Sequence, residues 1–179
     1  MKFLSSSLHG VEIIEHDVFE DQRGSFVKTF QESAFQREGL LSSFTESYYT
    51  NSKEAVIRGM HFQLPPYDHA KLVTVIQGTV VDVILDLRKN SPTFKCHFAV
   101  ELSRENRKSI YIPQGCAHGF GVLSDNAIVY YMTTSEHIPS HDKGIRYDSF
   151  GYDWNISNPI LSERDKCFGG LSEFEDFFD

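Results

Sequence analysis

The most regular alternation of hydrophobic and polar residues lies in the middle of the chain. Residues 72–76 and 79–87 are two hydrophobic runs separated by Gly78, which predicts a hairpin of two strands around a tight turn. Every second residue of the longer run is aliphatic, so one face of this strand carries Val81, Val83, Leu85 and Leu87. The other face carries the carboxylates of Asp82 and Asp86. A strand of this kind lines either solvent or a polar cavity.

Shorter runs of the same kind predict further strands along the rest of the chain. They cover residues 11–18, 25–30, 44–51, 94–102, 109–112, 119–123 and 127–134, with turns at 21–24, 91–93 and 113–115. A short helix is predicted at 32–38, closed by Gly39, and the acidic tail 173–179 is a second candidate helix. Many short strands with turns about every 8–12 residues are typical of an all-β sandwich or barrel.

The size and composition of the chain agree with this reading. Its 179 residues predict a single domain over residues 1–179, and 40% hydrophobic residues are enough to build a core. Phenylalanine and tyrosine, with 15 and 8 copies, favour sheet because aromatic side chains suit a pleated, half-buried surface.

The charge and the cysteines exclude several classes of protein. A formal net charge of -8 argues against nucleic acid as a partner, since a phosphate backbone attracts a basic surface. A small phosphorylated ligand stays compatible, because two or three arginine or lysine side chains can hold a diphosphate. Cys96, Cys116 and Cys167 are odd in number and form no CxxC motif, which argues against a disulfide framework and a structural zinc site.

The same features predict a cytoplasmic protein with no membrane partner. Residues 1–10 contain one lysine and no apolar run long enough for a signal peptide. No stretch approaches the ~18 uninterrupted apolar residues of a membrane-spanning helix. The cysteine usage favours a reducing compartment.

Two short motifs indicate which β-fold this is. Residues 113–120 match the PxGxxH turn that forms the second half-motif of cupin barrels, with His118 at the start of the next strand. Together with the Gly78 turn, this motif predicts a cupin-type double-stranded β-helix, a jelly-roll barrel with short peripheral helices. A metal-binding cupin would need His-x-His and a downstream Glu in the first half-motif. The chain has His61-Phe62-Gln63 and then Lys71, whose charge repels a metal, so we expect neither metal nor cofactor.

A longer series of motifs resembles the dTDP-4-dehydrorhamnose 3,5-epimerase family over residues 10–168. The motifs are residues 56–63, 65–66, 70–73, 78, 82–83, 86–88, 91–93, 112–115, 117–120, 131 and 161–165. The resemblance implies an isomerase that acts on a nucleotide-linked 4-keto-6-deoxysugar. It would invert C3 and C5, as in the conversion of dTDP-4-dehydro-6-deoxy-D-glucose to dTDP-4-dehydro-L-rhamnose.

The chemistry of such a reaction needs a base, an acid on the opposite face and a cation near the ketone oxygen. His61 is the natural base because an unperturbed histidine has a pKa of about 6.5. Lys71 is the candidate for stabilising the enolate. The resemblance implies that Asp165 orients His61 and that Tyr131 donates the proton from the other face. Asp82 and His118 are expected to support the polar interior of the barrel.

The resemblance also implies how the substrate is bound. Arg23, Arg58 and Arg164 would hold the diphosphate. A homodimer is expected in which the Arg23 turn and Phe26 complete the partner subunit's site. The predicted substrate-binding set is Arg23, Phe26, Glu46, Arg58, Gln63, His137 and Arg164. His69, His97 and His141 belong to no motif and are expected to be structural or exposed.

Two places depart from the family pattern. His137 stands where the family usually has an aromatic residue, often tyrosine, and residues 46–52 lack the common Gln-x-Asn pattern. Both fall where sugar or nucleotide would be recognised. A monoepimerase acting at C3 or C5 alone, or a keto-isomerase, on a dTDP-, CDP- or GDP-linked sugar therefore stays open. Outside the family, the alternatives are a metal-dependent cupin dioxygenase and a non-catalytic sugar-binding cupin.

Overall fold

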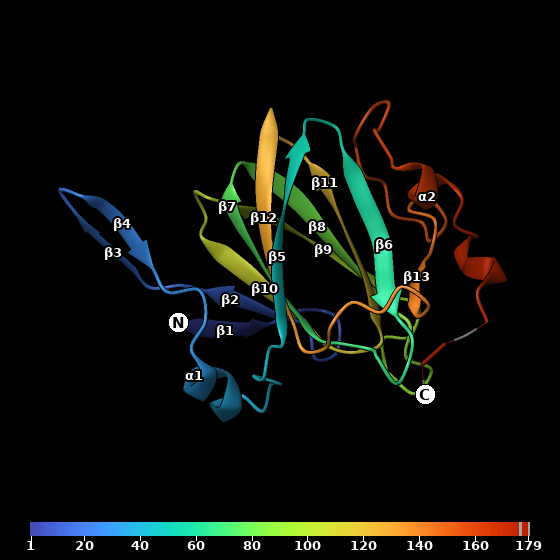
Figure 1. The fold of residues 1–179 in the computed structure, drawn as a ribbon, viewed down its shortest axis with the longest axis horizontal. Coiled ribbons are helices and arrows are strands. Elements are labelled where there is room, and N and C mark those ends of the chain that lie inside the picture. The colour runs from blue at the N-terminus through green and yellow to red at the C-terminus, as the bar shows by residue number, and fades with distance from the viewer. Residues whose placement is uncertain (176, 179) are drawn as a thin grey trace.

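Two antiparallel β-sheets form most of the computed structural model, which describes residues 1–175, 177 and 178 (Figure 1). The six-stranded sheet contains, in spatial order, β1 (Lys2–Ser5), β2 (Glu12–Glu15), β10 (Lys108–Ile112), β7 (Lys71–Gln77), β12 (Asn126–Thr133) and β5 (Glu46–Lys53). The five-stranded sheet contains β13 (Asp142–Gly144), β6 (Ile57–Gln63), β11 (Cys116–Val122), β8 (Thr79–Asp86) and β9 (His97–Ser103). The predicted all-β jelly roll with short peripheral helices is confirmed.

The turn at Gly78 is present, but the hairpin predicted around it is wrong. β7 pairs with β10 and β12, whereas β8 pairs with β11 and β9, so the chain passes from one sheet to the other at this glycine. Gly78 has φ +76°, and a Cβ there would lie 2.0 Å from the carbonyl oxygen of Asn126. The crossing places Val80 and Ile84 of β8 against Val73 and Val75 of β7 in the core between the sheets.

The core between the sheets is built from the inward faces of their strands. Its fully buried members include Val73, Val80, Ile84, Leu102, Ile110, Phe120 and Val129. Each side chain of this size contributes about 1.5–3 kcal/mol when it is completely buried. At one end of the barrel, polar residues replace this apolar packing, and the cavity described below opens there.

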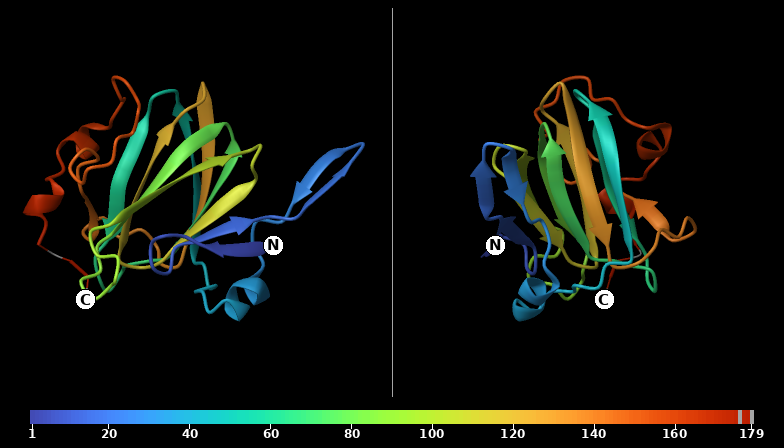
Figure 2. Two further views of the ribbon diagram at one scale, coloured as in Figure 1. Left: turned by 180° about the vertical axis from the view of Figure 1, so that it is seen from behind. Right: turned by 60° about the vertical axis from the view of Figure 1, so that its left-hand side comes forward.

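The outer face of the five-stranded sheet is covered by the C-terminal part of the chain (Figure 2). The aliphatic face predicted for β8, which includes Val83, Leu85 and Leu87, packs against Ile145 and Trp154. This covering segment contains α2 (Glu163–Lys166) and a 3₁₀ helix (Leu171–Glu173). Sequence analysis did not expect α2, which is too short for a helical periodicity to show.

The acidic tail does not form the predicted helix in its described part. The helical hydrogen bonding there ends with the 3₁₀ turn at Leu171–Glu173, and Phe178 packs into the apolar cluster behind β8. Asp176 and Asp179 lie outside the described residues. None of the helices in the described ranges is long and apolar enough to cross a membrane.

The N-terminal segment forms α1 (Glu32–Arg37), as predicted, and a hairpin of β3 (Val18–Asp21) and β4 (Gly24–Val27). The strand predicted over 11–18 is divided into β2 and β3, and the one predicted over 25–30 ends at Val27. The hairpin projects away from both sheets (Figures 1 and 2). Phe19 and Phe26 on it are 67% and 59% exposed.

Candidate functional site

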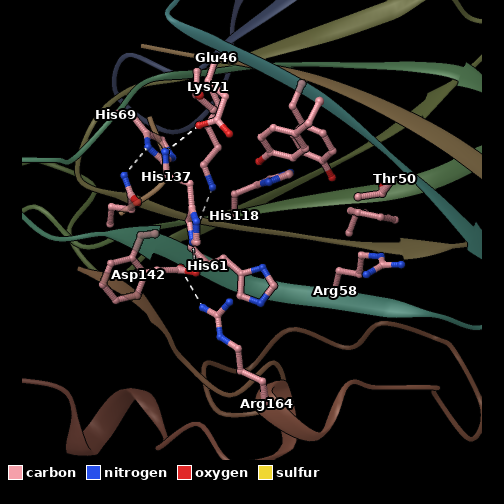
Figure 3. A pocket seen from close by; sticks show the side chains of 16 residues that line it. Glu46, Thr50, Arg58, His61, His69, Lys71, His118, His137, Asp142 and Arg164 are labelled. Carbon is pink, nitrogen blue, oxygen red and sulfur yellow. Dashed lines mark hydrogen bonds and ion pairs between the residues drawn. The ribbon is translucent and has the colours of Figure 1, made fainter. Parts of the chain in front are cut away.

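A cavity of about 350 Å³ opens between the two sheets. Figure 3 shows the side chains that line it. Most of the predicted site residues are among them: Glu46, Arg58, His61, Gln63, Lys71, His118, Tyr131, His137 and Arg164. Asp165 and Asp82 lie directly behind two of these side chains, whereas Arg23 and Phe26 lie on the β3–β4 hairpin.

His61 on β6 faces the cavity and is held by a carboxylate from α2. Its Nε2 lies 2.8 Å from Oδ1 of Asp165. Burial raises the pKa of Asp165, but hydrogen bonds from His61, the Gly59 amide and Ser162 outweigh it and lower that pKa below the usual value. Because a carboxylate only accepts, the imidazole proton lies on Nε2 and the lone pair on Nδ1. The arrangement fixes both the ring and its tautomer.

Two glycines let the strands carrying the two central histidines approach closely. Gly59 on β6 has φ +140°, and a Cβ there would lie 2.5 Å from Cα of Gly119 on β11. His61 and His118 are direct partners in the register of these strands. The glycines in the two sequence motifs therefore place the two rings side by side.

His118 forms a second histidine–aspartate pair, deeper in the wall. Its Nε2 lies 2.8 Å from Oδ2 of Asp82 on β8, and both side chains are almost completely buried. Burial lowers the pKa of His118, and the charge and hydrogen bond of Asp82 oppose that shift only in part. The other oxygen of Asp82, Oδ1, has no hydrogen-bond partner among the described residues.

Lys71 enters the cavity from the first residue of β7. It is 6% exposed, and its Nζ donates a hydrogen bond to the carbonyl oxygen of His61 at 3.2 Å. Burial lowers its pKa to about 8, against the opposing charges of Asp142 and Asp82. A cation with little solvent around it interacts strongly with any negative charge that forms beside it.

Tyr131 on β12 comes from the six-stranded sheet, opposite the wall that carries His61. Its ring stacks on Tyr48 of β5 with a centroid distance of 4.7 Å and an interplanar angle of 16°. Burial and the nearby Asp82 carboxylate raise the pKa of Tyr131 well above its ordinary value. Its hydroxyl is therefore a proton donor throughout the physiological pH range.

Asp142 links the side chains of His137 and Arg164 at the rim of the cavity. His137 Nε2 lies 2.9 Å from one of its oxygens, and Arg164 donates to the other at 2.8 Å. The backbone amide of His137 donates to Glu46 at 2.7 Å. Burial raises the pKa of Asp142, yet hydrogen bonds from Arg164 and His137 prevail and lower it.

Gln63 acts on this rim through the backbone. Its Oε1 accepts a hydrogen bond from the Ile138 amide at 2.6 Å, and its Nε2 donates to the carbonyl oxygens of Tyr67 and Glu136. The amide thus holds the loop that presents His137.

Sequence analysis missed several side chains of the cavity wall: Tyr48, Thr50, His69, Thr133 and Asp142. Tyr48 and Thr50 alternate with Glu46 along β5, so the period of a strand would have placed all three on one face. His69, expected to be structural or exposed, lines the cavity, where Gln63 Nε2 donates to its Nδ1 at 3.1 Å and burial lowers its pKa to about 3. His97 packs against Phe150 and Tyr152, as expected for a structural histidine.

The described residues contain no group of three or more His, Cys, Asp or Glu side chains arranged to hold a metal ion.

Comparisons with known proteins identify the family of this chain. A family model described as dTDP-4-dehydrorhamnose 3,5-epimerase matches residues 5–173. The enzyme of that name from Methanothermobacter thermautotrophicus is 43% identical over 177 residues, which cover 96% of this chain and 95% of that protein.

Solved structures agree as well. The dTDP-6-deoxy-D-glucose-3,5-epimerase of Legionella pneumophila, in complex with dTDP-4-keto-L-rhamnose, is 32% identical with a TM-score of 0.94. It covers 99% of this chain and 97% of that one. The dTDP-4-dehydrorhamnose 3,5-epimerase of Bacillus anthracis, with TDP and PPi bound, is 34% identical with a TM-score of 0.92. The match covers 95% of this chain and 99% of the Bacillus anthracis chain. The chain belongs to the dTDP-4-dehydrorhamnose 3,5-epimerase family.

Proposed function

We propose that this protein inverts C3 and C5 of a dTDP-linked 4-keto-6-deoxysugar, converting dTDP-4-dehydro-6-deoxy-D-glucose to dTDP-4-dehydro-L-rhamnose. The observation that carries the proposal is the placement of the His61–Asp165 pair and Tyr131 on facing sheets, with Lys71 in the same cavity. Such an arrangement can remove a proton from one face of a sugar and return one to the other.

The base in this proposal is Nδ1 of His61. The C–H bonds at C3 and C5 are acidic because each lies next to the C4 ketone. With Nε2 bonded to Asp165, the lone pair of Nδ1 accepts the proton, and the carboxylate stabilises the imidazolium that forms.

Removal of the proton leaves an enolate with its charge on the C4 oxygen. Lys71 is the cation proposed to meet that charge, and its burial makes the interaction strong. The proton then returns from Tyr131, on the opposite wall of the cavity. The His118–Asp82 pair supports this wall, since the His118 ring packs edge-on against Tyr131 at 5.9 Å.

Binding of the nucleotide part is assigned to the cationic side of the cavity. Arg58 and Arg164 are proposed to hold the diphosphate, since guanidinium groups pair with phosphate oxygens. Glu46 and His137 contact the sugar or nucleotide, and Gln63 positions the loop that carries His137.

A homodimer is proposed in which the β3–β4 hairpin completes the partner subunit's cavity with Arg23 and Phe26. Its support is the projecting hairpin, on which Phe19 and Phe26 are largely exposed and lie 6.4 Å apart between ring centroids. An isolated two-stranded hairpin is marginally stable in water, so a second chain would stabilise it. For location, we propose the cytoplasm, supported by the exposed free thiols of Cys96 and Cys167.

Proton NMR of the purified protein with dTDP-4-dehydro-6-deoxy-D-glucose in heavy water tests the function. We expect deuterium uptake and inversion at both C3 and C5. Inversion at one carbon alone would make the protein a monoepimerase, and a moved carbonyl would make it a keto-isomerase. No exchange with the dTDP-, CDP- and GDP-linked sugars would overturn the proposal in favour of a non-catalytic or dioxygenase cupin.

A further inference from the structure

The cavity wall that faces His61 carries two tyrosines instead of one. Tyr48 on β5 and Tyr131 on β12 are direct partners in the strand register, and both line the cavity. Their rings are nearly parallel, with centroids 4.7 Å apart. The two hydroxyls therefore belong to one rigid, stacked unit on the six-stranded sheet, across from the base.

The two hydroxyls have different surroundings. The charges of Glu46 and Asp142 act on Tyr48, whereas those of Asp82 and Arg58 act on Tyr131. Figure 3 shows Glu46 and Asp142 on one side of the cavity and Thr50 and Arg58 on the other. Glu46 and Thr50 are four residues apart on one strand, which corresponds to roughly 13 Å. The two stacked rings thus place their hydroxyls in different electrostatic surroundings on the same wall.

The proposed reaction needs two proton deliveries from this wall. C3 and C5 lie on either side of the C4 ketone, and each must receive a proton on the face opposite His61. A hydroxyl fixed on a rigid strand reaches one of these carbons better than the other. Building on the proposed function, we propose that Tyr48 is a second proton donor, so that Tyr131 serves one of the two carbons and Tyr48 serves the other.

Each delivery balances in the same way. His61 takes the proton from carbon and becomes an imidazolium, while the electron pair moves to the C4 oxygen. The tyrosine O–H bond then breaks as the new C–H bond forms, which leaves a tyrosinate and a ketone. The imidazolium proton returns to the tyrosinate through solvent, and the site is restored. Tyr48 holds its proton until it is needed, because burial and the two nearby carboxylates raise its pKa to about 12.

Single hydroxyl deletions test the assignment, because Tyr→Phe keeps the stacked ring. Tyr48→Phe, Tyr131→Phe and the double variant are compared in heavy water, with washout and inversion followed separately at C3 and C5. The matched controls are Tyr49→Phe and Tyr130→Phe, since this neighbouring pair has the same register but points to the outer face of the sheet.

We expect Tyr48→Phe to lose inversion at one carbon by at least ~10²-fold, the usual contribution of a general acid, while that carbon still exchanges its proton with retention. Tyr131→Phe should show the complementary loss at the other carbon, and the controls should match the wild type. Retained inversion at both carbons in Tyr48→Phe, or an equal slowing of both, would overturn the second donor. A wild-type protein that exchanges neither proton would overturn the proposed function itself.

Discussion

His61 and His118 are neighbours on β6 and β11, and each has its Nε2 2.8 Å from a carboxylate oxygen. Their access to the cavity differs. The side chain of His61 is 29% exposed and that of His118 is 4% exposed. Asp165, the partner of His61, lies on α2, which packs against β6. Asp82, the partner of His118, lies on the adjacent strand β8.

If His61 is the base, as we propose, a short hydrogen bond to a carboxylate does not by itself make a catalytic base. Both histidines have one, so the pair geometry is the same. The larger exposure of His61 is what favours it over His118 as the base. His118 is almost completely buried, and its pair with Asp82 places a fixed ring edge-on against Tyr131.

The largest effect on activity is expected from substituting one of the two histidines at a time. His61→Asn should lower exchange at both carbons by up to about 10⁴-fold, because it removes the general base proposed for both carbons. His118→Asn should slow exchange far less but destabilise the fold by about 3–5 kcal/mol, since it leaves the buried Asp82 carboxylate without its partner. NMR measures the exchange rates of both variants, and urea unfolding measures their stability. Equal rate losses in both variants would contradict the comparison.

Lys71 lies against the first of these pairs and gives the next largest effect. Lys71→Met should slow exchange by about 10²–10³-fold, as loss of an enolate stabiliser does. It should also stabilise the fold at pH 7, by roughly 3 kcal/mol, because the lowered pKa of about 8 measures how much burial disfavours the charged amine. Lys53→Met on exposed β5 is the control. Activity and urea unfolding measure both effects, and a less stable, fully active Lys71→Met would refute this role.

The smallest effect is the pH dependence that the same lysine imposes. Above about pH 8 the folded protein loses the Lys71 proton, so kcat/KM should fall by about tenfold per pH unit. The free energy of unfolding should instead increase as the pH rises. Between about pH 8 and the free value of 10.5 the unfolded chain binds more protons than the folded one, so the free energy of unfolding rises with pH there. A pH–rate profile and unfolding at several pH values check both, and Lys71→Arg should flatten the decline in rate.

The sequence predicted strands better than it predicted their partners. Alternation identified most strands, and the PxGxxH motif located His118. Alternation could not show that β7 and β8 lie in different sheets, because a hairpin and a crossing between sheets leave the same residues buried. Asp165 came from the family resemblance alone, since α2 has only four residues and no periodicity. Tyr48 was missed because its contact with Tyr131 depends on the register between β5 and β12, which lie far apart in the sequence.

The two histidine–aspartate pairs close chain segments of very different length, and this difference affects when activity arises during synthesis. Asp82 and His118 are 36 residues apart, whereas Asp165 lies 104 residues beyond His61. Closing so long a loop is slow and depends on the intervening sheets. A nascent chain can thus complete the buried pair while the base still lacks its carboxylate. Enzymatic turnover would therefore be among the last properties to appear on folding, and among the first lost when the C-terminal segment detaches.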